Sequence, residues 1–407
     1  MNMNEQLPDN QRVVVTGMGA VTPVGKTLPD SWQAIKDGEH GIKKIADTRL
    51  ASVEGILETG AAIAAPAPDI ELSDALLPEH RTKMRSSWWH PSAKLGFLAL
   101  YESLNDAQLL DPSKLQLDSE KVDKFRAGFY LGSTFSGADQ LGSVIDTGGA
   151  RLDDLMKYLP ARAATAPAMP LGLNGPGGLI AEECASGGSA VRLGAKEMHS
   201  YWGGQTDADV MVVGGTDAEL SRYNLMLFGA AKGTVDPTDN PEEASRPLDE
   251  DRNGLVMGEA SGALTLETYA HAKARGLPYE NIYAELVGYA NLTEAANETR
   301  AGMEGAIRVI EQALVMARVV VGETVYFNGH FTSTIDGDPI EMEAIKQAVE
   351  NLGLRPEDIW LTSTKGATGH TMGAAGAIEA AFAILAMRDG TVPPGLKLYK
   401  PIEEAAG

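Results

Sequence analysis

The chain has 407 residues, of which 43% are hydrophobic and 22% charged, a composition that is typical of a folded soluble protein and excludes disordered and collagen-like chains. Its formal charge of −22 opposes binding to nucleic acid, because Lys and Arg side chains supply most of the affinity for phosphates. A single cysteine, Cys184, excludes an internal disulfide and a multi-cysteine metal cluster and fits a reducing compartment.

Neither a signal peptide nor a membrane span is predicted. Residues 1–11 are polar and lack the apolar core of a signal peptide. The longest nearly uncharged apolar stretch, residues 372–387, contains Glu379 and is too short to cross a bilayer. We therefore expect a cytoplasmic protein.

The first expected element is a buried strand over the β-branched residues 12–16, which enter a Gly17-x-Gly19 turn. Thr22 stands where a dinucleotide-binding motif has its third glycine, and a helix is expected only from about Ser31. Both features disfavour a Rossmann site.

Strands and helices alternate along the rest of the chain. Strands are expected over residues 125–131, 210–213, 325–328 and 360–364, and helices over 79–110, 185–200, 340–352 and 373–387. This alternation predicts an α/β fold with mainly parallel sheets. The Ala and Gly residues inside the expected helices favour central helices that approach the sheets closely.

Three reactive groups each follow an expected strand and precede an expected helix, which is where open α/β sheets bind ligands. Cys184 is expected at a helix N-terminus, which lowers the pKa of a thiol, although a lone cysteine is also commonly a buried structural residue. His330 and His370 lie in Gly- and Thr-rich loops. There, a neutral imidazole can stabilise an oxyanion, move protons or make a structural hydrogen bond.

Other chemistries have less support in the sequence. It contains no Gly-x-Ser-x-Gly elbow of a serine hydrolase, no phosphate-binding Gly-x4-Gly-Lys-Ser/Thr loop and no short-range Cys/His pair for a metal. A cysteine nucleophile with two histidines remains, and it favours acyl-type chemistry.

At these residues the chain resembles the elongating β-ketoacyl-acyl-carrier-protein synthases of the KAS I/II type, with KAS II as the nearer branch. A cysteine with two histidines is similar to these enzymes, whereas initiating relatives and thiolases use other partner sets. The matching motifs are spread over most of the chain: residues 12–19 and 23–25, 184–187, 207–215, 245–247 with Asp249, 251–252, 258–259, 337–338 with Glu341, and 365–379.

The resemblance implies a thiolase-like α/β fold with αβαβα layers, built from two similar halves. The first half, residues 1–275, would carry Cys184, and the second, residues 276–407, would carry His330, Lys365 and His370. It also leads us to expect that the family's last C-terminal strands are missing after Gly407, together with a Gly-Phe-Gly-Gly loop that gives a second oxyanion donor.

The activity implied is a decarboxylative Claisen condensation in fatty acid or polyketide biosynthesis. Cys184 would accept an acyl chain from an acyl-carrier protein, and its own N–H would be one oxyanion donor. His330 and His370 would bind the malonyl thioester and stabilise the enolate formed on loss of carbon dioxide. No metal or redox cofactor is expected, because decarboxylation creates the nucleophile and both substrates are carried on phosphopantetheine.

Further residues take roles by the same resemblance. Lys365 and Glu379 would form a supporting ion pair. Thr332 and Thr334 would contact the phosphopantetheine arm and Phe228 would gate the acyl pocket, the alternatives being loop capping and core packing. Four basic residues lie where relatives dock the acidic carrier, although an ordinary solvated helix face is the alternative: Arg81, Lys83, Arg85 and Lys232. Relatives also imply a homodimer.

Two local departures from the family bear on activity. Glu182-Glu183 replaces small neutral residues before the cysteine and disfavours the thiolate. Phe331 replaces the glycine usual after His330, so that it restricts the backbone and crowds the pantetheine channel. A catalytically silent partner subunit of the chain-length-factor kind and a degenerate malonyl decarboxylase remain as alternatives. Retention of Cys184 and both histidines argues against the silent subunit.

Overall fold

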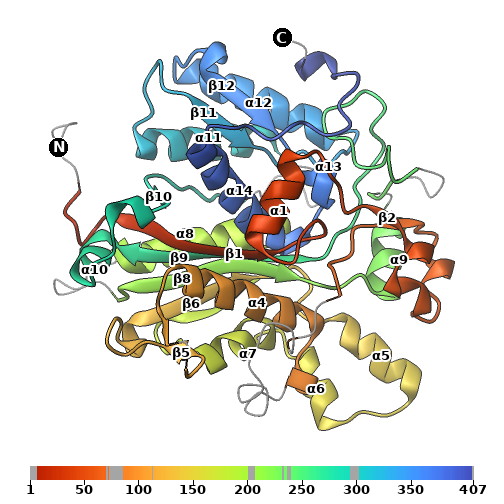
Figure 1. The fold of residues 1–407 in the computed structure, drawn as a ribbon. Helices are drawn as coiled ribbons and strands as arrows, with labels where there is room; N and C mark the ends of the chain where they lie inside the picture. The colour runs from red at the N-terminus through yellow and green to blue at the C-terminus, as the bar shows by residue number, and fades with distance from the viewer. Residues whose placement is uncertain are drawn as a thin grey trace.

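The computed structural model describes residues 7–69, 72, 86–111, 113–199, 207–231, 233–235, 240–293 and 302–405. A six-stranded sheet with the order β10-β1-β9-β8-β6-β7 lies at its centre (Figure 1). Its strands are β1 (Val13–Val21), β6 (Ala127–Gly132), β7 (Gly177–Ile180), β8 (Val210–Asp217), β9 (Ala260–Thr268) and β10 (Ala284–Glu285).

Helices cover both faces of this sheet. On one face lie α4 (Pro91–Asp106) and α7 (Arg162–Leu171), and on the other lie α8 (Ser186–His199) and α14 (Ala375–Asp389). A parallel pair, β11 (Val325–Asn328) and β12 (Ile359–Thr362), packs on the far side of α14. Beyond this pair lie α11 (Met303–Ala317) and α12 (Gly337–Asn351) (Figure 1). The stack of helices, sheet, helices, sheet and helices confirms the predicted αβαβα layers.

The remaining elements are short and lie around these layers. The helices are α1 (Leu28–Lys36), α5 (Asp139–Thr147), α6 (Leu152–Tyr158), α9 (Arg222–Ala230), α10 (Tyr269–Ala274) and α13 (Lys365–Thr368). Two small hairpin-like pairs join β2 (Lys43–Lys44) to β3 (Ile63–Ala64) and β4 (Leu110–Asp111) to β5 (Gln116–Leu117). Within the part of the chain that the structure describes, no helix is long and apolar enough to cross a bilayer.

The prediction of mainly parallel sheets was wrong for the large sheet, which is mixed. β1, β6, β7 and β8 run in one direction, while β9 runs the opposite way between β1 and β8. The expected strands included part of β8 but did not include β9, although both strands are buried along their whole length. Of the two, only β8 begins with a continuous apolar run, residues 210–213, of the kind that usually indicates a parallel sheet.

The expected helix over residues 79–110 was also too long. The described helix α4 begins only at Pro91, where the His90 side chain accepts a hydrogen bond from the Ser92 N–H. Proline at the first helical position and a capping acceptor before it favour a helix start at that point. The helix ends at Asp106, and Gln108 adopts a left-handed backbone with φ of 59°. The expected strand over 325–328 coincides with β11.

Glycines allow the central layers to approach one another closely. A Cβ atom on Gly17 of β1 would lie 2.2 Å from the Ser103 carbonyl oxygen of α4. On the opposite face, a Cβ on Gly215 of β8 would lie 2.2 Å from the Gly373 carbonyl oxygen. The expectation of small residues inside the central helices is confirmed by Gly194 of α8, where a Cβ would lie 2.2 Å from Val213 Cγ1 of β8. The predicted division between residues 275 and 276 stays a prediction.

We predict that Gly17→Ala lowers the free energy of unfolding, because the new methyl group would overlap backbone atoms of α4 that cannot rotate away. The expected loss is about 1–3 kcal/mol, measured by urea denaturation. Gly149→Ala is the matched control, since nothing lies within 4 Å of a Cβ there. A loss of equal size in both variants would contradict the close packing of β1 on α4.

Candidate active site

Cys184 lies in a tight 3₁₀ turn, Glu183–Ala185, directly before α8. Glu183 has a left-handed backbone with φ of 51°, which is uncommon for a residue with a side chain. The turn is closed by Ser186, whose hydroxyl donates to the Glu183 carbonyl at 2.5 Å and accepts from the Glu182 N–H at 2.9 Å. Such strained backbone is often found at active sites.

His370 lies in the loop between α13 and a 3₁₀ turn, Met372–Ala374, and its ring faces the cysteine. Its Nε2 atom is 3.0 Å from Cys184 Sγ. The Met372 N–H donates to Nδ1 at 3.3 Å, so we assign the ring proton to Nε2. His370 therefore presents an N–H towards the sulfur atom. Backbone hydrogen bonds to Val256 and from Gly258 hold the loop in place.

His330 follows β11 and completes the cluster. Its ring centroid lies 5.0 Å from that of His370, with the two planes nearly perpendicular. Ligand atoms of Cys184, His330 and His370 all lie within 4.8 Å of one another. Glu341 fixes the loop, because its carboxylate accepts the N–H groups of His330 at 2.6 Å and Phe331 at 2.7 Å. Residues that are far apart in the sequence therefore converge on one site.

For the thiol, the expected effect of Glu183 is confirmed, whereas the expected lowering of the pKa by the helix N-terminus is not. Burial raises the pKa of Cys184 to about 11, and the charges of Glu183 and Asp217 raise it further, while the Lys365 ammonium lowers it. The predicted lowering by the helix N-terminus was therefore wrong, because the sulfur loses water in the turn that precedes α8. The Glu182 carboxylate accepts hydrogen bonds from Ser189 and Asn291.

Both imidazoles are neutral at pH 7. Burial lowers the pKa of His330 to about 3, with a smaller contribution from the Lys365 ammonium, although part of this residue is open to solvent. Burial also lowers the pKa of His370 well below its ordinary value, as do the nearby His330 and Lys365. A neutral imidazole with its proton on Nε2 is a hydrogen-bond donor and carries no charge that must be removed before it can act.

Lys365 and Glu379 form a short ion pair beside these residues, as the sequence predicted. The Lys365 side chain is only 1% exposed. Its ammonium is the cation that acts on the thiol and on both imidazoles. Burial raises the pKa of Glu379, and Lys365 opposes that change.

Asp217 is a residue of the site that sequence reasoning missed. It is 1% exposed and accepts hydrogen bonds from Ser133 Oγ at 2.6 Å, Thr134 N at 2.9 Å and Gly373 N at 2.7 Å. It thus joins the end of β8 to the loop after β6 and to the loop that carries His370. A carboxylate that ends an otherwise apolar strand was the only sign of it in the sequence.

The other predicted residues lie around this centre. Phe228 packs with Phe135, at 5.8 Å between ring centroids, in an apolar cluster that includes Cys184. Thr332 and Thr334 lie side by side after His330, with 3.1 Å between their hydroxyl oxygens. These placements are compatible with the predicted gate and pantetheine contacts, which stay predictions. The four docking residues lie outside the described residues: Arg81, Lys83, Arg85 and Lys232.

Phe331 does not crowd the site. Its side chain is fully buried in a cluster with Leu248, Ile345 and Val349. A Cβ on Gly329 would lie 2.2 Å from the Phe331 ring, so the glycine makes room for it. The expectation that Phe331 crowds the pantetheine channel was therefore wrong, because the ring turns into the core.

Two family models match consecutive parts of the chain. The N-terminal domain of β-ketoacyl synthase matches residues 10–272, and the C-terminal domain matches residues 283–399. Among curated relatives, the 3-oxoacyl-[acyl-carrier-protein] synthase 2 of Rhizobium meliloti is 34% identical over 97% of this chain and 90% of its own length. That of Vibrio harveyi is 32% identical over the same shares.

Solved structures agree with these sequence matches. A β-ketoacyl synthase from Burkholderia phymatum superposes with a TM-score of 0.80 at 27% identity, covering 97% of this chain and 90% of that one. The ishigamide ketosynthase/chain length factor gives a TM-score of 0.81 at 25% identity with the same coverage. With domain models over most of its length and a curated relative at 34% identity, the chain belongs to the β-ketoacyl synthase family.

Proposed function

We propose that this protein is a β-ketoacyl-acyl-carrier-protein synthase, an acyltransferase that condenses an acyl chain on Cys184 with malonyl-acyl-carrier protein in fatty acid biosynthesis. The observation that carries the residue assignment is the 3.0 Å approach of His370 Nε2 to Cys184 Sγ, with His330 beside them. It combines a nucleophile with two neutral N–H donors in one site.

Acyl transfer begins at the sulfur atom. Cys184 Sγ attacks the thioester carbonyl carbon, the bond from that carbon to the carrier sulfur breaks, and the thiol proton leaves with the carrier thiol. The Lys365 ammonium favours this step because it stabilises negative charge on the cysteine sulfur. Glu379 balances the Lys365 charge, so the free site keeps little net charge.

Condensation uses both imidazoles as donors. The malonyl thioester oxygen accepts N–H bonds from His330 and His370 while the bond to the carboxylate carbon breaks and carbon dioxide leaves. The resulting enolate carbon attacks the acyl-enzyme carbonyl, the bond to Cys184 Sγ breaks, and the thiolate takes up a proton. The product is longer by two carbons. Neutral imidazoles suit this step since the donors must stabilise negative charge that forms only during the reaction.

We propose that condensation requires no metal and no redox cofactor, because breaking the carbon–carbon bond supplies the electron pair. Both substrates would be carried on phosphopantetheine. One solved relative, with a TM-score of 0.79 at 25% identity, is a type II polyketide ketosynthase in complex with its acyl-carrier protein. This supports docking of a carrier protein, for which Arg81, Lys83, Arg85 and Lys232 remain the predicted patch.

We also propose a homodimer. Exposed apolar side chains on and around α5, α6 and α7 support a protein interface on that side of the molecule: Leu141, Ile145, Leu152, Leu155, Leu159 and Met169. Among the described residues, β7 pairs only with β6 at the edge of the six-stranded sheet, and α7 packs against it. A cytosolic location stays a prediction from composition.

The proposed function predicts an acyl adduct on Cys184. Incubation with an acyl-carrier thioester should raise the intact mass of the protein by one acyl group, and added malonyl-carrier should remove it as product. Cys184→Ala should form no adduct, and we expect Cys184→Ala and His370→Ala to lose condensation by at least about 10³-fold. Wild-type protein without an adduct would support the silent subunit, and malonyl loss without an adduct would support the decarboxylase.

The raised pKa of Cys184 predicts how alkylation depends on pH. Because only the thiolate reacts, the rate with iodoacetamide should rise about tenfold per pH unit from pH 7 until the pKa is reached. That pKa is about 11 in the free enzyme, so the rate should still be rising at pH 9. An ordinary thiol would level off near about pH 8.5, and such a plateau would contradict the desolvated site.

The ion pair of Lys365 and Glu379 predicts a non-additive effect on stability. Lys365→Met should cost about 3–5 kcal/mol in urea unfolding, because it leaves a buried carboxylate without its partner. Lys365→Met with Glu379→Leu should recover much of that loss while activity stays low. If the loss of stability in the double variant equals the sum of the losses in Lys365→Met and in Glu379→Leu alone, the two residues do not act as a pair.

A further inference from the structure

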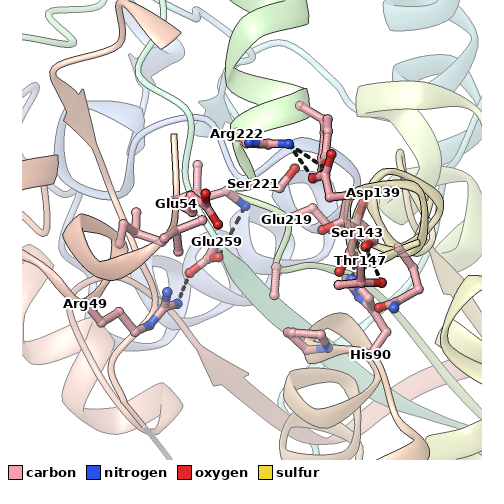
Figure 2. Close-up of a pocket in the computed structure, with 18 residues that line it drawn as sticks. Arg49, Glu54, His90, Asp139, Ser143, Thr147, Glu219, Ser221, Arg222 and Glu259 are labelled. Carbon is pink, nitrogen blue, oxygen red and sulfur yellow. Dashed lines mark hydrogen bonds and ion pairs between the residues drawn. The ribbon is translucent and has the colours of Figure 1, made fainter. Parts of the chain in front are cut away.

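The proposed reaction does not use a cavity that lies outside the cluster of Cys184, His330 and His370 (Figure 2). Its volume is about 430 Å³, and it is lined by the N-terminal end of α4, by α5, by the segment after β8 and by residues 49–54. Figure 2 shows His90, Asp139 and Glu219 close together on one side of the cavity. Each comes from a different element: the start of α4, the start of α5 and the segment after β8.

His90 lies between the two carboxylates. Its Nε2 is 2.9 Å from Asp139 Oδ1, and its Nδ1 is 3.9 Å from Glu219 Oε1. Ser92 Oγ is 3.2 Å from His90 Nδ1. Ligand atoms of His90, Asp139 and Glu219 all lie within 4.8 Å of one another. Small side-chain rotations would bring them to the roughly 3.3 Å that separates ligands around a tetrahedral zinc ion.

Glu219 has an acceptor that nothing in the described structure satisfies. Its side chain is 0% exposed, and Oε1 accepts the Gly137 N–H at 2.7 Å and the Ser92 hydroxyl at 3.3 Å. Oε2 is buried without a hydrogen-bond partner among the described residues. A buried carboxylate oxygen without a donor is costly, so Glu219 Oε2 favours a bound cation or a proton.

We propose that His90, Asp139 and Glu219 bind one divalent transition-metal ion of the zinc type. One imidazole nitrogen and two carboxylate oxygens are a donor set that such ions accept, whereas magnesium and calcium prefer oxygen ligands alone. In the free structure His90 Nδ1 accepts the Ser92 N–H, so binding of the ion would move the ring proton from Nε2 to Nδ1. Nδ1 would then donate a hydrogen bond to the Ser92 hydroxyl, which donates its own to Glu219 Oε1. This would leave Nε2 free for the ion and orient both ligands, as groups behind metal ligands commonly do.

The ion would stabilise a loop next to the acyl-binding region and would not take part in condensation. Glu219 accepts the Gly137 N–H, and Asp217, the last residue of β8, accepts the Thr134 N–H. Both carboxylates therefore anchor the loop that follows β6. Between these points, Phe135 packs against Phe228 in the cluster that includes Cys184. The ion therefore acts at the side of the site that is expected to hold the acyl chain.

The test uses the full-length Cys184→Ala chain, because Cys184, His330 and His370 form a second set of close ligands. After treatment with a chelator, this protein is titrated with Co²⁺ and Zn²⁺ and bound metal is counted by mass spectrometry. We expect one ion per chain, and Co²⁺ absorption without the charge-transfer band that a thiolate would add. Excess Zn²⁺ should raise the melting temperature, because the ion binds only the folded chain.

Substitutions in the same background locate the ion. Glu219→Gln and Asp139→Asn keep the side-chain size and should each weaken binding at least about tenfold. Asp146→Asn is the matched control, since this carboxylate lines the same cavity but pairs with Arg222, and it should change the affinity by less than about twofold. Circular dichroism checks that each variant is folded.

Two results would overturn the proposal. One is that the Cys184→Ala chain binds no ion with at least micromolar affinity. The other is that Glu219→Gln and Asp139→Asn bind as tightly as their parent chain. If Zn²⁺ stabilises neither protein and Glu219→Gln is more stable than its parent, the site is instead a cluster in which Glu219 is protonated and His90 pairs with Asp139. Loss of condensation in any of the earlier tests would leave the metal result unaffected.

Discussion

The active site depends on how closely the loop around Gly373 approaches the two elements beneath it. The Gly373 carbonyl oxygen lies 2.2 Å from the position of a Cβ on Gly215 and 2.6 Å from that of a Cβ on Gly187. Its N–H donates to the buried Asp217. A side chain at either glycine would push the loop outwards and move His370 away from the sulfur. Close backbone packing, not a long-range charge, therefore sets the distance between nucleophile and donor.

Electrostatics then acts on a geometry that is already fixed. The site contains one buried cation, Lys365, among a thiol and two imidazoles, and burial is the first cause of each pKa shift. Burial favours the uncharged form of all three groups, and Lys365 opposes this only at the sulfur. The active site of the free enzyme consequently contains a neutral thiol and two neutral hydrogen-bond donors. These donors stabilise the negative charge that forms on the substrate during the reaction.

Much of this site could be predicted because its chemistry lies in short motifs. Cys184, His330 and His370 were marked by their places between strands and helices, and Lys365 and Glu379 by the family resemblance, and the structure brings them together. The direction of β9 could not be predicted, since β9 was not among the expected strands and its direction is set by pairing with β1 and β8. The pKa of the Cys184 thiol could not be predicted either, because it is raised by the loss of water around the sulfur, and the residues that exclude this water are distant in the sequence. Asp217 was missed for the same reason, because its partners come from two segments that are distant from it in the sequence.

The packing of Phe331 also restricts how this loop can change. Its ring fills the space that a side chain at position 329 would need, and together with Ile345 and Val349 it forms part of the core behind the loop. The two positions are thus mechanically linked. Exchange of Phe331 for a small residue would leave a void behind His330, and any larger residue at 329 becomes acceptable only after that exchange. Natural variation at these two sites should therefore be correlated, so that transplanting one without the other into a related synthase would disturb the histidine between them.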